Sequence, residues 1–99
     1  MTYQHIRQAI LDRRCASALY EGYVRVFCPR TIGTDKDGVV VVEAFQYGGG
    51  HPGGLSHGGV WCYFHVGQLD WISVNGDSWH TGGDRERHGD RVVDVDVSS

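Results

Sequence analysis

The spacing of apolar and polar positions predicts one helix at the start of the chain, followed by β-structure. Residues 2–14 place Tyr3, Ile6 and Ile10 at helical spacing, and polar side chains occupy most of the remaining wheel. A stripe of about three turns is too short to stand alone in water, so we expect this helix to pack over one end of a sheet. From Cys15 onward the pattern becomes typical of strands.

Five short runs rich in β-branched and aromatic residues follow the helix, and each predicts a strand. They cover residues 15–20, 23–28, 39–47, 60–66 and 69–74. Pro29 lacks a backbone N–H, so we expect it to end the second strand or to lie on an edge. The third run is apolar on both faces at its start and follows an Asp37-Gly38 turn, which predicts a central strand.

Two segments lack this regular pattern. Residues 48–59 hold seven glycines and one proline, a composition that predicts a mobile loop because ordering it costs much backbone entropy. Residues 84–90 form a charge run and predict a solvated tail. Residues 91–97 alternate valine with aspartate, which leaves an edge strand and disorder equally open. We therefore expect one domain over residues 1–80 and a charged tail over residues 81–99.

Composition narrows the class of protein. The 99 residues suffice for one domain, and 15 glycines with three Trp and five Tyr favour a globular β-protein with many tight turns. The net charge of −3 argues against a general polyanion binder. No apolar run approaches the ~20 residues of a membrane span. Three scattered cysteines without a signal-like start predict reduced thiols in a cytoplasmic protein.

Several motifs in order along residues 5–75 resemble the WYL domain. They are Ile6-Arg7-Gln8-Ala9-Ile10 with Tyr20, then Arg25-x-x-x-Pro29, Gly38 and Ala44, then Phe64-His65-Val66-x-x-Leu69. The resemblance implies a small five-stranded SH3-like or Sm-like barrel with one N-terminal helix, the plan that the predicted elements also suit. The family occurs mostly as the ligand-sensing half of bacterial transcription regulators, and this chain holds no helix-turn-helix segment beside it.

The chain departs from the family at the residues that carry its name and its charge. The naming tripeptide falls on Val40-Val41-Val42, and the basic R-x-F-R cluster falls on Cys62-Tyr63-Phe64-His65. The resemblance therefore places His65 at the position of a ligand arginine and Gln68 at the next basic position. In the family these basic residues suit anionic, nucleotide-like ligands.

Residues 51–70 contain side chains of the types that bind metals or act in catalysis. His51, His57, Cys62 and His65 are ligand types, but Cys62 and His65 would point to opposite faces of one strand, so we expect no metal and no cofactor. The same separation argues against Cys62, His65 and Asp70 as a catalytic set, and we expect no enzyme.

The arginines suggest a binding site. Arg25 and Arg30 flank Pro29 among aromatic residues, a pattern that suits an anionic ligand or single-stranded nucleic acid, although solvated arginines would give the same pattern. The predicted ligand-binding residues are Arg25, Arg30, Tyr63, His65 and Gln68. We expect a non-catalytic ligand-binding or sensing module for such a ligand, and a regulatory role stays open. The alternative is an Sm-like module that assembles into a homo-oligomer through strand edges without a small ligand.

Overall fold

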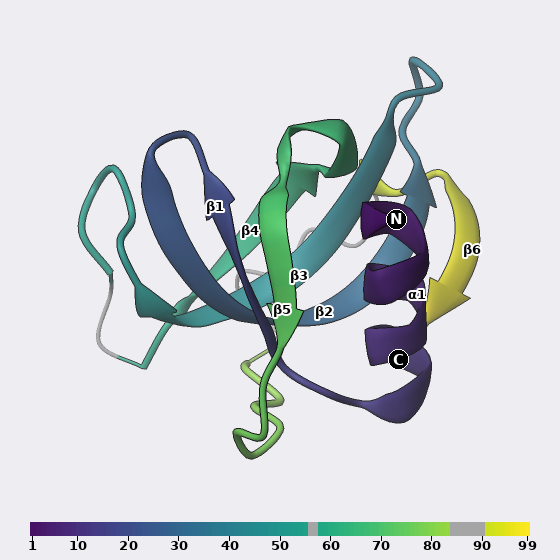
Figure 1. The fold of residues 1–99 in the computed structure, drawn as a ribbon. Coiled ribbons are helices and arrows are strands. Elements are labelled where there is room, and N and C mark those ends of the chain that lie inside the picture. Colours follow the sequence, from purple (N-terminus) through teal and green to yellow (C-terminus); the bar gives the residue numbers. More distant parts are fainter. Residues whose placement is uncertain (56–57, 84–90) are drawn as a thin grey trace.

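The computed structural model describes residues 1–55, 58–83 and 91–99. In these residues, one helix and six strands follow one another, with a short 3-10 turn between the fourth and fifth strands (Figure 1). They are α1 (Thr2–Asp12), β1 (Ala16–Tyr20), β2 (Tyr23–Thr34), β3 (Val40–Gly49), β4 (Val60–His65), η1 (Val66–Gln68), β5 (Asp70–Val74) and β6 (Asp94–Ser98).

The helix forms where the apolar stripe predicts it. Ile6, Ala9 and Ile10 are buried, so the stripe faces the sheet, and α1 lies beside β6 and across β2 (Figure 1). The sequence offers Thr2 as an N-cap, but Thr2 is already the first helical residue and Met1 takes the cap position. The helix ends two residues before the predicted end because Arg13 adopts a left-handed conformation, and its N–H bonds back to the last turn.

All strands belong to one antiparallel sheet with the order β4-β3-β2-β1-β5, and β6 adds to β2. The mostly-β class with a single helix is therefore confirmed, and six strands are present where five were predicted. The sheet is not closed: within the described residues, β4 pairs only with β3, and β5 pairs only with β1. Inward side chains of the strands and of α1 share one core, which includes Ile6, Tyr20, Phe27, Val42 and Phe64.

Pro29 does not end its strand, so the first of the two alternatives was wrong, whereas the second holds locally because Pro29 has no partner among the described strands along one edge of β2. β2 continues to Thr34 because it changes partners at the proline. Along one edge, β1 pairs with β2 as far as Phe27, and β6 pairs with β2 from Thr31 onward. Pro29 lies between these two ladders, where a missing N–H costs no strand hydrogen bond. The proline thus marks the exchange of β1 for β6 along a bent strand.

The C-terminal residues supply the sixth strand, which settles the choice between strand and disorder for most of residues 91–97. β6 begins three residues later than predicted and ends at Ser98. Gly33 on β2 permits this pairing, because a Cβ atom there would lie 2.0 Å from the carbonyl oxygen of Asp94. The predicted solvated run at residues 84–90 lies outside the described residues.

The glycine-rich segment begins as strand. Gly48 and Gly49 are the last residues of β3 and pair with β2, so this part of the predicted mobile loop is regular structure. Gly49 has a positive φ of 77°, and a Cβ atom there would lie 2.0 Å from the carbonyl oxygen of Val24. Glycine is therefore required where β3 closes against the start of β2.

No helix among the described residues has the length and apolar character that crossing a bilayer requires.

Candidate anion-binding site

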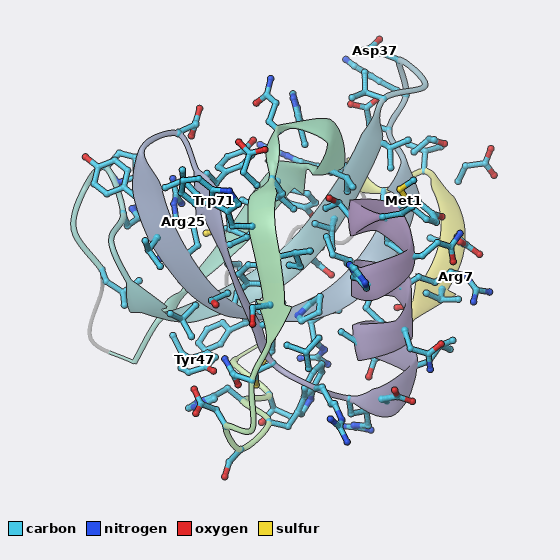
Figure 2. All side chains as sticks on the ribbon, viewed as in Figure 1. Met1, Arg7, Arg25, Asp37, Tyr47 and Trp71 are labelled. Atoms are coloured by element: carbon cyan, nitrogen blue, oxygen red, sulfur yellow. The ribbon has the colours of Figure 1, made fainter. Side chains whose placement is uncertain are left out.

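The most unusual side chain of the core is Arg25. It lies on β2 between Ala18 of β1 and Gly49 of β3, two small residues that leave room for a long side chain. The residue is only 2% exposed, and Figure 2 shows it beside the β1–β2 hairpin. A guanidinium this deeply buried has to be compensated by aromatic faces, hydrogen bonds or an anion.

Three aromatic rings surround the charge. The guanidinium carbon lies 5.3 Å from the ring centre of Tyr20, 5.4 Å from that of Tyr23 and 5.5 Å from that of Phe64. Tyr20 and Phe64 also pack edge to face, with ring centres 4.8 Å apart. The negative faces of the rings offset part of the desolvation cost of the cation. The cage also fixes the plane of the guanidinium.

The polar contacts leave one corner of Arg25 unfilled. Its Nε donates to the carbonyl oxygen of Tyr20 at 3.3 Å, and its Nη1 donates to Oε1 of Gln46 at 3.2 Å. Nη2 is buried and has no hydrogen-bond partner among the described residues. Its closest carboxylate oxygen is Oε1 of Glu21 at 3.6 Å, from a side chain that is 61% exposed. The buried cation therefore retains donor capacity for an anion.

Gln46 holds the arginine in this position. It lies fully buried on β3, and its Nε2 donates to the carbonyl oxygens of Gly48 at 2.9 Å and Gly50 at 2.7 Å. These bonds orient Oε1 toward Arg25 and tie the end of β3 to the site. Gln46 was not among the predicted site residues. The available signal was an amide within a mostly apolar run at residues 39–47, where Glu43 is the other polar side chain of the strand interior.

A recess of about 180 Å³ opens beside Arg25. Its wall is largely aromatic, with Tyr20, Trp61 and Phe64 as well as Cys62, and Glu21, His51 and Pro52 also line it. Burial raises the pKa of the Cys62 thiol to about 11, although the charge of Arg25 opposes this shift. The thiol is therefore protonated at neutral pH and is a poor nucleophile. The recess thus combines aromatic rings and several polar groups with one buried cation, an arrangement that suits binding.

Of the five predicted ligand-binding residues, the recess brings together Arg25 and Tyr63. The hydroxyl of Tyr63 lies 3.4 Å from Oε2 of the buried Glu43, and the guanidinium of Arg91 lies over its ring. Its polar end is therefore engaged outside the recess. His51 and Trp61 also line the recess and were not predicted to bind a ligand, because no local pattern joins either residue to Arg25.

Arg30, His65 and Gln68 do not line the recess. Arg30 is buried elsewhere, where its Nη1 donates to the carbonyl oxygen of Thr81 at 2.6 Å and its Nε and Nη2 donate to that of Ser99 at 3.3 Å. The side chains of His65 and Gln68 are exposed at the far end of β4 and in η1. The backbone N–H of His65 donates to the hydroxyl of Tyr20. The structure therefore places Arg25 and Tyr63 at the recess and the other three predicted site residues elsewhere.

The residues considered for a metal site or a catalytic set do not lie together. Cys62 is buried, whereas His65 and Asp70 are exposed. His57 lies outside the described residues. In the part of the chain that the structure describes, no group of three or more His, Cys, Asp or Glu side chains is arranged to hold a metal ion.

Comparisons of this chain with protein-family models, with curated proteins and with solved structures found no match.

Proposed function

We propose that this protein is a non-catalytic binding module for a small organic anion, which it binds in the recess beside Arg25. One observation carries the proposal: Nη2 of a guanidinium that is almost fully buried has no hydrogen-bond partner among the described residues. An anion that displaces the Glu21 carboxylate would fill this corner. It would also neutralise a charge that the fold has already desolvated, so little of that cost would fall on binding.

Glu21 supports this interpretation. Its side chain is 61% exposed and that of Arg25 is 3% exposed, so the carboxylate approaches the cation from the solvent side. The oxygen lies 3.6 Å from Nη2, which is longer than a charge-assisted hydrogen bond of about 2.7–2.9 Å. Glu21 is thus a weakly held internal carboxylate at the position that a ligand carboxylate or phosphate would take.

The dimensions of the recess support a small ligand. Its volume of about 180 Å³ is below the roughly 300–1,000 Å³ of sites for drug-sized ligands. A single cation within an aromatic wall suits one carboxylate or monophosphate on a small planar body. The overall charge of −3 does not favour a long polyanion. The resemblance to the WYL domain, whose ligands are anionic, supports the same class.

Titration followed by NMR tests the proposal. Probes are acetate, benzoate, phosphate, adenosine monophosphate and a short thymidine oligonucleotide. The side-chain Nε–H of Arg25 and the indole N–H of Trp61 report from the site. We expect saturable shifts of both signals with benzoate or the monophosphate, with a Kd of about 1 mM. Stronger binding of the oligonucleotide than of any small probe would instead indicate single-stranded nucleic acid as the ligand.

Three variants assign the binding to the recess. Glu21→Gln removes the competing carboxylate and should tighten binding roughly 3- to 10-fold. Cys62→Met fills the recess and should abolish binding while Arg25 remains. Arg25→Gln should also abolish it, and Arg14→Gln, at an exposed arginine, is the matched control. Two results would contradict the proposal. In the first, the probes bind Arg25→Gln and Cys62→Met as tightly as they bind the parent chain. In the second, no probe binds the parent chain or any folded variant.

A second candidate function is self-association, favoured by the exposed edge at β5. Trp71 is 82% exposed, and its φ of 56° is strained for a bulky residue. It lies in a bulge, because Ala18 of β1 faces two residues of β5 between the Ser17–Ser73 and Leu19–Asp70 pairs. An exposed tryptophan on an edge that no other described strand pairs with is typical of a surface that pairs with another chain. Light scattering that gives the 11.0 kDa of one chain at every concentration would exclude this candidate.

We also propose that the bent sheet is an SH3-like or Sm-like barrel. Two features support this. β2 has 12 residues and pairs along one edge with β1 and then with β6, while β3 pairs along its other edge through two register shifts, a pattern typical of a strongly bent strand. η1 connects the two end strands of the sheet, β4 and β5, through only three residues. The gap between these end strands is the same open edge on which self-association would depend.

A further inference from the structure

Cys15 and Cys28 face each other across the start of the β1–β2 ladder. Ala16 pairs with Phe27, so continuing the antiparallel register by one residue places Cys15 opposite Cys28. Both residues are fully buried, and their sulfur atoms are 2.8 Å apart. Directly opposed residues of an antiparallel pair have Cα atoms about 4.5–5.5 Å apart, within the roughly 4.4–6.8 Å that a disulfide spans.

We propose that Cys15 and Cys28 are an intrachain disulfide site, which a peroxide oxidises. Two thiols and one hydrogen peroxide give one disulfide and two water molecules: each sulfur loses its proton, the S–S bond forms, and the peroxide O–O bond is broken by the two electrons. The sulfurs have to approach from 2.8 Å to roughly 2.05 Å. Cys62, the third cysteine, lies on β4 in the wall of the Arg25 recess.

A covering segment, residues 75–83, encloses the two thiols. Cys15 donates its S–H to the carbonyl oxygen of Ser78 at 3.4 Å, and the backbone N–H of His80 donates to the sulfur of Cys28 at 3.3 Å. The backbone N–H of Asn75 also donates to the carbonyl oxygen of Cys15 at 2.9 Å. The pair is therefore shielded from solvent by a segment that has no helix or strand of its own.

Tyr47 fastens the covering segment to β3. Its hydroxyl donates to Oδ2 of Asp77 at 2.6 Å, and its ring stacks on that of His80 with centres 3.9 Å apart. Figure 2 shows Tyr47 beside this segment, below the sheet. Burial also raises the pKa of Cys28 to about 12, which keeps the thiolate scarce while the segment is closed. Oxidation therefore has to follow a local opening of residues 75–83.

The disulfide would in turn alter the covering segment. Oxidation removes the S–H of Cys15, so the carbonyl oxygen of Ser78 loses this donor, whereas the sulfur of Cys28 can still accept from His80. The cross-link restrains the unfolded chain and stabilises the sheet. The oxidised protein should thus have a more stable sheet under a looser covering segment.

The experiment treats the folded protein with hydrogen peroxide and follows the intact mass and the disulfide-linked peptides. We expect a product lighter by two hydrogen atoms, with Cys15 linked to Cys28, and a melting temperature several degrees higher that returns to its original value on reduction. Amide exchange of residues 75–83 should become faster in the oxidised form. Refolding in a glutathione redox buffer should give the same pairing.

Matched variants separate the steps. Cys62→Ser should form the cross-link at the original rate, and Cys15→Ser should not form it. Tyr47→Phe keeps the ring but loses the bond to Asp77, so it should oxidise several-fold faster. A product linked through Cys62 or between chains, a lower melting temperature on oxidation, or reduced thiols after both treatments would overturn the proposal. An unchanged rate in Tyr47→Phe would overturn the role of the covering segment. None of these outcomes depends on anion binding.

Discussion

Gln46 of β3 accepts a hydrogen bond from the buried guanidinium of Arg25, with 3.2 Å between Oε1 and Nη1. The same amide donates to the carbonyl oxygens of Gly48 and Gly50, so one side chain joins the cation to the end of β3 and the residue that follows it. All of these groups lie in or beside the core, where an unpaired donor or acceptor is costly. Gln46 therefore positions the candidate site and stabilises the fold.

Replacing Gln46 tests that dual role. Gln46→Met keeps the length of the side chain but leaves Arg25 and two carbonyl groups without their partner. We expect the free energy of unfolding in urea to fall by about 1–3 kcal/mol. The molecules that remain folded should bind the anion more weakly than the parent chain does. Gln68→Met, at an exposed glutamine, should change stability by no more than about 0.5 kcal/mol. Equal stabilities for the two variants would contradict the assigned role.

The pairing of β6 depends on the absence of a side chain at Gly33. A Cβ atom there would lie 2.0 Å from the carbonyl oxygen of Asp94, and backbone cannot yield as a flexible side chain does. Gly33→Ala should therefore displace β6 and lower the free energy of unfolding by about 1–3 kcal/mol. Gly76→Ala is the control, because nothing lies within 4 Å of the added atom. Faster amide exchange at Val95 and Val97 in Gly33→Ala alone is the expected signature.

Replacing Trp71 by glycine removes a large side chain and is expected to stabilise the fold. Its φ of 56° is costly for tryptophan and readily adopted by glycine, and the ring is 82% exposed, so little packing is lost. We expect Trp71→Gly to raise the free energy of unfolding by about 1 kcal/mol. If β5 mediates self-association, the same variant should remain a single chain in light scattering. A clear loss of stability would show that the ring packs against the protein.

Acid should weaken the contact between the helix and the last strand. The hydroxyl of Tyr3 donates to Oδ2 of Asp96, and Nε of Arg7 lies 3.1 Å from the same oxygen. The Tyr3 hydrogen bond and the Arg7 bond and charge hold the pKa of Asp96 below its ordinary value. A depressed carboxyl pKa stabilises the fold above the unfolded-state value of about 3.9, and this contribution is lost as pH falls through the folded-state value.

The comparison variant for this contact is Asp96→Asn. Melting temperatures of the parent chain and the variant should differ above about pH 5 and converge in acid, because protonated Asp96 and asparagine are both neutral. A difference that stays constant between neutral pH and about pH 2 would mean that the charge of Asp96 plays no part in the contact.

The sequence by itself determined the local elements whose patterns are complete within a few residues. The stripe of Ile6 and Ile10 located α1, and the β-branched and aromatic runs located β1, β3, β4 and β5 to within a few residues. These elements could be predicted because helix and strand periodicity depend on which faces are buried, and a short window records that pattern. Arg25 and Tyr63, two of the five predicted ligand-binding residues, line the recess, and their binding of a ligand stays a prediction.

Only the tertiary structure decided how those elements combine. Pro29 continues β2 because β1 and β6 divide its edge, and β6 is a strand because Gly33 lets it approach. The candidate site unites Arg25 of β2 with Gln46 of β3 and Cys62 of β4, and the second cluster unites Cys15 with Cys28. Such contacts depend on strand register and on which neighbours satisfy a buried charge. The register and the partners are those that minimise the free energy of the whole chain, so a short stretch of sequence cannot predict them.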